Sequence, residues 1–110
     1  MYYTEFEAGG KTYKLRLNTR NLIALEKRIG VNPVSIFGNG DKLPTVTTMV
    51  DILFVSLQEL QHGINLETAY GIFDDYIADG HKPTDFCMEI VKIYQVSGLL
   101  PKEEATAEKN

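Results

Sequence analysis

The chain has 110 residues, of which 44% are hydrophobic, and it carries a formal net charge of −4. This length fits one domain with a single core, and the acidic balance argues against a nucleic-acid-binding protein, which normally presents a basic face. Cys87 is the only cysteine, so an intrachain disulfide is excluded and a reducing cytoplasm is the expected compartment.

Residues that direct a protein into or across a membrane are not expected in this chain. The first ten residues, MYYTEFEAGG, contain acids and glycines where a signal peptide requires a basic start and an apolar run. The most apolar stretch, residues 49–57, is too short to span a bilayer and contains Asp51. We therefore expect a soluble protein that stays inside the cell.

Residues 2–17 predict a β-hairpin. Both halves, YYTEFEA and KTYKLRL, are rich in aromatic and β-branched residues, and the glycines at 9–10 supply the positive φ angles of a tight turn. In the second half, apolar and basic residues alternate from Tyr13 to Leu17, so one face is wet. Because two strands alone are marginal in water, the hairpin must pack on helices or on another subunit.

The first helix is predicted over residues 19–29, with Asn18 or Thr19 as its N-cap and Gly30 as its end. Its apolar stripe consists of Leu22, Leu25 and Ile29. A single helical turn follows in VNPVSIFG, where Pro33 fits the first position of a helix.

The helix predicted over residues 45–61, which Pro44 can start, is the most apolar of the chain. One stripe at helical spacing consists of Val46, Met49, Val50, Leu53, Leu57 and Leu60. Ile52, Phe54 and Val55 lie off that stripe, so the middle of the helix is apolar nearly all round. Such a helix is either the central one of a bundle or part of an interface.

Two more helices are predicted, over residues 66–79 with Asn65 as N-cap and over residues 83–97 with Gly98 as the end. Their expected inward residues are Leu66, Ala69, Tyr70, Phe73, Tyr76 and Ile77 in the first, and Phe86, Cys87, Ile90, Val91 and Tyr94 in the second.

The predicted fold class is therefore mainly α: an N-terminal β-hairpin followed by a compact bundle of four main helices plus a short helical turn. Residues 1–100 are expected to form a single globular domain, with the hairpin in 1–17 and the helices in 18–98. Residues 101–110, PKEEATAEKN, are polar and are expected to form a disordered C-terminal tail.

The acidic residues Asp74, Asp75 and Asp79 before Gly80 do not form a calcium loop. An EF-hand counted from Asp75 would need oxygen ligands at its third and twelfth positions, which are apolar here. A solvated helix face is the expected role.

The other reactive or ligand-type side chains are scattered. His62 and His81 each lie beside a glycine at a predicted helix end, and Cys87 lies on an apolar helix face, where a thiol is usually inert. FGNGDK, residues 37–42, lacks the spacing of a phosphate-binding loop. We therefore expect a non-enzymatic protein with no catalytic residues, no cofactor and no metal.

The chain has more apolar residues than the core of one small domain needs. In a monomer, some of the following five residues are therefore expected to remain partly exposed: Ile52, Phe54, Val55, Ile72 and Ile93. Exposed apolar patches mark interaction sites. The alternative is that a core of four or five helices buries all of them.

Four segments in order resemble the tail assembly chaperones of long-tailed bacteriophages and Gram-positive prophages. They are KLRLNTRNLIALEKRIGVNPVSIF, LPTVTTMVDILFVSLQEL, YGIFDDYIADG and IVKIYQVSGLL. The resemblance covers roughly residues 12–100, and its order rather than any single motif carries it.

The resemblance implies a helical protein made in the cytoplasm of the bacterial host and absent from the finished virion. Such proteins bind the long tape measure protein, keep it soluble and recruit tail tube subunits, and they often self-associate or have a longer, frameshifted form. They offer no catalytic or ligand residues. From pattern alone we expect partners at the outer side of the central helix, at Ile52 and Val55, with Phe37 at the rim.

Two other classes of function stay open. One is a structural tail-completion or connector subunit, which would remain in the virion. The other is a small regulatory, antitoxin-like protein-binding domain unrelated to tails.

Overall fold

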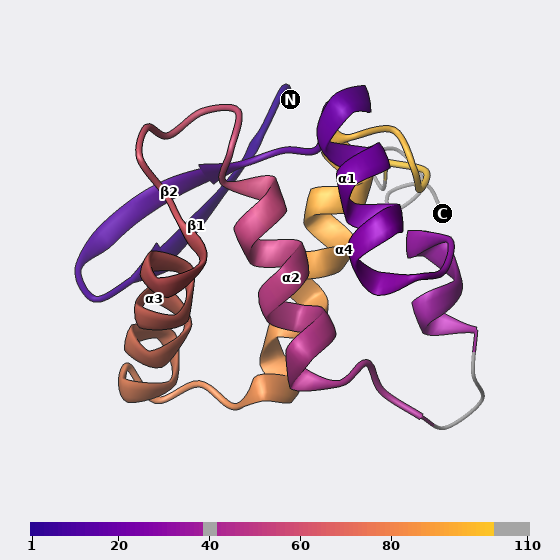
Figure 1. Ribbon diagram of the computed structural model, residues 1–110. Coiled ribbons are helices and arrows are strands. Elements are labelled where there is room, and N and C mark those ends of the chain that lie inside the picture. The colour runs from indigo at the N-terminus through magenta and orange to yellow at the C-terminus, as the bar shows by residue number, and fades with distance from the viewer. Residues whose placement is uncertain (39–41, 103–110) are drawn as a thin grey trace, which may run out of the picture.

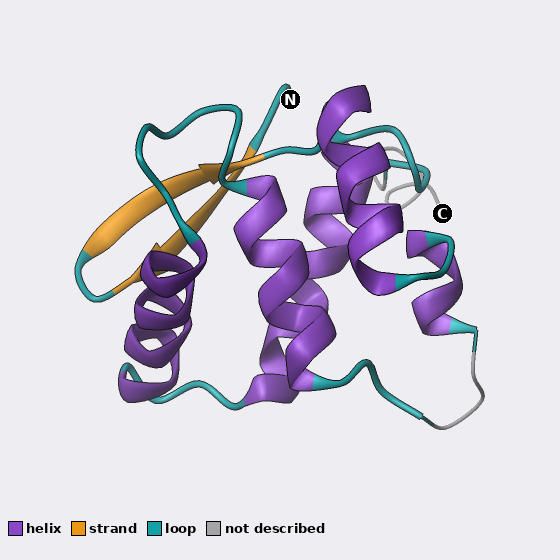
Figure 2. Cartoon of the chain, viewed as in Figure 1, coloured by secondary structure: helices purple, strands orange, loops and turns teal. Residues whose placement is uncertain are grey.

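The computed structural model describes residues 1–38 and 42–102. In chain order its elements are β1 (Thr4–Ala8), β2 (Lys11–Leu15), α1 (Thr19–Ile29), the 3-10 turn η1 (Pro33–Phe37), α2 (Val46–Ser56), α3 (Leu66–Ala78), the 3-10 turn η2 (Pro83–Asp85) and α4 (Phe86–Val96). Figures 1 and 2 show an N-terminal hairpin followed by four main helices. The predicted fold class is confirmed. The predicted disordered tail lies, from residue 103 to its end, outside the described residues.

None of the helices that the structure describes has the length and apolar character needed to cross a membrane.

The hairpin forms as its sequence predicts. The strands pair antiparallel, from Thr4 opposite Leu15 to Ala8 opposite Lys11, and the two glycines of the turn have φ angles of 61° and 79°. Phe6 then points from the hairpin to the helices, with its ring 4.9 Å from that of Tyr76 and 5.5 Å, edge-on, from that of Phe86. The hairpin thus packs on α3 and α4, which supplies the support that two strands need.

Local sequence signals begin and end the helices. The side chains of Asn18, Thr45 and Asn65 each accept a hydrogen bond from the backbone N–H three residues later, at the start of α1, α2 and α3. Gly30 ends α1 in the left-handed conformation, with φ of 77°, and its N–H donates to the carbonyl of Glu26. These bonds satisfy backbone groups that have no partner within the helix.

Helix α2 ends at Ser56, five residues before the predicted end at 61. A continued helix would pair the carbonyl of Ser56 with the N–H of residue 60, but that carbonyl accepts instead from the N–H of Arg16, at 3.1 Å. The side chain of Gln58 donates to the carbonyls of Phe54 and Ile64. The carbonyl of Ser56 therefore finds its partner outside the helix, and the chain turns toward α3.

The core is built around α2, which lies between α1 and α3 with α4 behind it (Figure 1). Because helices pack around it, most of its apolar side chains are buried. Ile52 and Val55 are only 0% and 3% exposed. The expectation that they lie on an outer surface is wrong, and of the five residues considered for exposure only Phe54 is half-buried.

The inward faces of α3 and α4 differ from the prediction at particular positions. Ile72 and Ile93 are buried, whereas Tyr70, expected inward, is 45% exposed. Cys87 and Val91 are only half-buried. Tyr76 and Phe73 are buried as predicted, so the buried face of α3 differs from the prediction by including Ile72 in place of Tyr70.

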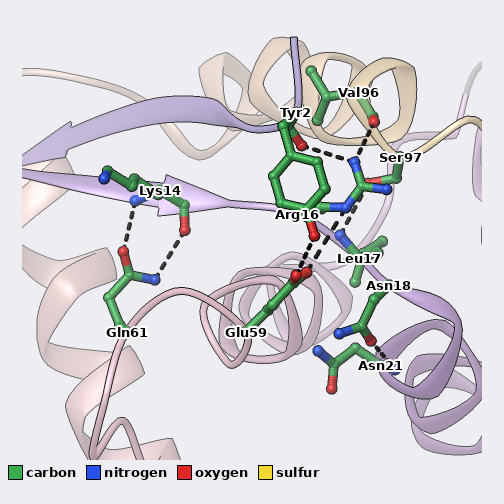
Figure 3. Close-up of polar contacts among 10 residues, drawn as sticks. All are labelled: Tyr2, Lys14, Arg16, Leu17, Asn18, Asn21, Glu59, Gln61, Val96 and Ser97. Carbon is green, nitrogen blue, oxygen red and sulfur yellow. Dashed lines mark hydrogen bonds and ion pairs between the residues drawn. The ribbon is translucent and has the colours of Figure 1, made fainter.

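A network centred on Arg16 fastens the N-terminal segment to the end of α4 (Figure 3). Its Nη1 donates to the carbonyls of Tyr2 and Val96, at 2.7 Å and 2.8 Å, and its guanidinium lies 4.0 Å from the centre of the Tyr2 ring. The Tyr2 hydroxyl donates to Glu59, whose other oxygen is 3.7 Å from Arg16 Nε. This bond to a carboxylate raises the pKa of Tyr2. We interpret the network as a structural clamp.

Candidate functional site

A groove of about 510 Å³ lies between α2 and α3. We call it the α2–α3 groove; its lining consists of Val46, Thr47, Val50 and Asp51 from α2, and Glu67, Tyr70, Phe73 and Asp74 from α3.

The groove has an apolar floor and apolar walls. Val50 and Phe73, at 7% and 6% exposure, form the floor, while Val46 and Tyr70, at 49% and 45%, stand at the surface. Large apolar side chains that line a groove and remain half exposed are typical of interaction sites. This arrangement can accept apolar side chains from another protein.

Acidic side chains surround this apolar surface. Glu67 and Asp74 are exposed on α3. On α2, the carboxylate of Asp51 accepts from Nε of Arg28 at 2.7 Å, and the Arg28 guanidinium lies 5.0 Å from the centre of the Phe54 ring. Within residues 1–38 and 42–102, neither Glu67 nor Asp74 forms an ion pair. Their charges are thus available to a basic partner.

Sequence reasoning missed this groove. The spacing of Tyr70 predicts a place on the buried face of α3, and the spacing of Val46 predicts a place in the apolar stripe of α2. The helical period shows on which face of a helix a residue lies. It does not show how far along that face a neighbouring helix packs against it. A cue was present in the pairing of Tyr70 with Glu67 and Asp74 on one side of the helix.

The structure separates the residues predicted to bind partners. Phe37 is 37% exposed and packs edge-on against Tyr94, with ring centres 6.0 Å apart; it does not line the groove. Ile52 and Val55 are inside the core, so a partner cannot reach them unless α2 separates from the helices packed on it.

His81 and Cys87, which were considered as reactive or ligand-type side chains, pack against other residues of the fold. The His81 ring stacks on Tyr76, with centres 4.2 Å apart, and its Nδ1 is 3.9 Å from a carboxylate oxygen of Asp85. Burial raises the pKa of Tyr76 to about 12, and it raises the pKa of the Cys87 thiol, which makes the thiolate rarer. Among the described residues, no three or more His, Cys, Asp or Glu side chains are grouped so that they could hold a metal ion.

The acidic end of α3 serves the hairpin. Asp79 Oδ2 accepts from the backbone N–H of Gly9 at 2.9 Å, and a Cβ on Gly9 would lie 2.7 Å from Asp75 Oδ2. The close approach explains why the turn has glycine here. Asp79 is therefore a hairpin anchor rather than only part of a solvated face.

The model of a protein family described as "Family of unknown function (DUF6096)" matches residues 4–110. No curated protein and no solved structure matches the chain.

Proposed function

We propose that this chain, which belongs to the DUF6096 family of unknown function, is a non-enzymatic tail assembly chaperone of a long-tailed bacteriophage or prophage. In this role it binds the tape measure protein, keeps it soluble and recruits tail tube subunits in the cytoplasm of the bacterial host. The proposal joins the ordered resemblance over residues 12–100 to one structural observation, the α2–α3 groove.

The groove supports the proposal because its shape and chemistry suit a helical client. An amphipathic helix docks its apolar stripe into an apolar groove and leaves its polar face in water. Val50 and Phe73 offer a floor for the stripe, and Val46 and Tyr70 offer contacts on either side. A tape measure protein has long apolar stripes, and covering them would prevent its aggregation.

Among the three residues predicted from sequence to bind partners, only Phe37 remains a candidate for direct contact, because its side chain is exposed and those of Ile52 and Val55 are buried. It lies outside the groove lining. We assign it to a second contact, which the Phe37→Ala variant tests separately from the groove.

Co-expression with the protein encoded just downstream, which the proposal expects to be long and helical, tests the proposal. We expect the client to be insoluble alone and to co-elute with this chain on size-exclusion chromatography with light scattering. Absence of a complex, together with detection of this chain in purified virions, would instead support a structural tail-completion or connector subunit. Rescue of cells from a neighbouring toxin would support an antitoxin-like protein.

Variants then locate the binding surface. Tyr70→Asp and Val46→Asp place a charge on half-exposed groove walls, and we expect each to weaken client binding by about tenfold or more. Met88→Asp is the matched control, because Met88 on α4 is 61% exposed and outside the groove lining. Equal binding by all three variants, with the fold intact by circular dichroism, would exclude the groove as the client site.

A further inference from the structure

The outward side of α1 is basic with an apolar centre. Ile23 is 47% exposed, and Arg20 and Lys27, three residues before it and four after it, are also exposed. The opposite side of the helix carries the buried Leu25 toward α2. We call Arg20, Ile23 and Lys27 the α1 outer face.

The wall of the groove on α3 has the same spacing with opposite charge. Glu67 precedes Tyr70 by three residues, and Asp74 follows it by four. In both helices the two charges are therefore seven residues apart, which is about 10.5 Å along a helix axis. Each pair has one exposed large apolar residue between its charges, at the same register.

We propose that the α1 outer face of a second copy of this chain occupies the α2–α3 groove. Aligned in parallel, Arg20 meets Glu67, Ile23 meets Tyr70, and Lys27 meets Asp74. The two charge pairs fix the register. The apolar residue lies three positions after the first charge and four before the second in both helices, which favours the parallel orientation, in which Ile23 covers the exposed part of the Tyr70 ring and adds apolar contact.

A second copy is favoured over an intramolecular contact. Within one chain, α1 packs its Leu25 side on α2 and turns its outer face away, while Arg28 joins Asp51 at the groove edge. Over residues 1–38 and 42–102, neither Arg20 nor Lys27 forms an ion pair. Two complementary surfaces on different sides of one chain associate head to tail, and such contacts build rings or open filaments.

This interface would also regulate the groove. A second copy and a client helix would compete for the groove, so client binding would dissociate the self-associated copies. That competition rests on the proposed function, whereas the self-association does not and is tested without a client.

Light scattering after size-exclusion chromatography, over a range of chain concentrations and salt, measures the association. Reversal of either surface, Arg20→Glu with Lys27→Glu or Glu67→Lys with Asp74→Lys, should weaken it by about tenfold or more. Both reversals in one chain should restore it. The matched controls are Lys11→Glu with Lys82→Glu, and Glu5→Lys with Glu7→Lys, which change the charge equally at exposed sites elsewhere.

Single swaps test the register. Arg20→Glu should be rescued by Glu67→Lys and not by Asp74→Lys, because the parallel alignment pairs Arg20 with Glu67. A wild type that remains monomeric at every concentration would overturn the proposal, and so would association that both reversals leave unchanged. Either result leaves the client-binding proposal standing, since its own experiment uses the client and the groove walls.

Discussion

The side-chain amide of Gln61 pairs with the backbone of Lys14 as a neighbouring strand would. Its Oε1 accepts from the Lys14 N–H at 2.7 Å, and its Nε2 donates to the Lys14 carbonyl at 2.9 Å (Figure 3). The outer edge of β2 is thereby capped near its C-terminal end by a residue from the segment between α2 and α3. An edge strand with unpaired backbone groups is a template for unwanted pairing, so this contact both fastens the hairpin and protects it.

Gln61→Ala should lower the free energy of unfolding by about 1–2 kcal/mol, because Lys14 loses two hydrogen-bond partners and the segment loses its tie to β2. Urea denaturation measures the change. His62→Ala, at the exposed neighbouring position, is the control and should change stability by less than about 0.5 kcal/mol. Equal effects of the two substitutions would mean that the Gln61 contact contributes nothing.

Ile52→Ala should lower the free energy of unfolding by about 2–4 kcal/mol, because the residue is fully buried in the centre of α2 and its removal leaves a cavity. Ile23→Ala makes the same chemical change on an exposed helix face and should cost less than about 0.5 kcal/mol. Denaturation at dilute chain concentration compares them. A small effect at Ile52 would revive its assignment to an outer surface.

Asp79→Ala should destabilise the protein by about 1 kcal/mol, because the Gly9 N–H loses a charged acceptor. Hydrogen exchange of the Gly9 amide gives a local measurement, and faster exchange is expected. Asp74→Ala, on the same helix but away from the hairpin turn, should leave that amide unchanged. Unaltered exchange in Asp79→Ala would contradict the anchoring role.

The free energy of unfolding should depend on pH through the carboxyl group of Glu89. Burial raises the pKa of its carboxyl above the ordinary 4.5, against the opposing effects of Lys92 and His81. Just above pH 4.5 the native carboxyl therefore keeps a proton that the unfolded chain has lost, so this group stabilises the fold at acidic pH. The contribution is lost as the pH rises through the native pKa.

Glu89→Gln should remove that pH-dependent part, and at neutral pH it should be at least as stable as the wild type. Urea denaturation at a series of pH values from about 4.5 to neutrality, around the ordinary carboxyl pKa, measures it. Glu5→Gln, at an exposed position, is the control. A wild-type slope that persists in Glu89→Gln would assign the dependence to another group.

The sequence by itself determined where most elements begin and end. The caps at Asn18 and Asn65, the left-handed glycine after α1 and the two-glycine turn act through bonds among residues within about one helical turn, so their residue types suffice to locate them. The end of α2 at Ser56 could not be located in this way, because it depends on the N–H of Arg16, which follows β2 and is far from Ser56 in the sequence.

Only the tertiary structure decided which apolar residues are outside. Periodicity shows that α2 is apolar nearly all round, but a helix of that kind suits a core and an interface equally well. Ile52 and Val55 became core because α1, α3 and α4 surround α2, whereas Tyr70 lies at the surface because the groove between α2 and α3 leaves its ring partly uncovered. Burial depends on contacts between elements far apart in the sequence, and hydrophobic packing has no local code for which neighbour covers which face.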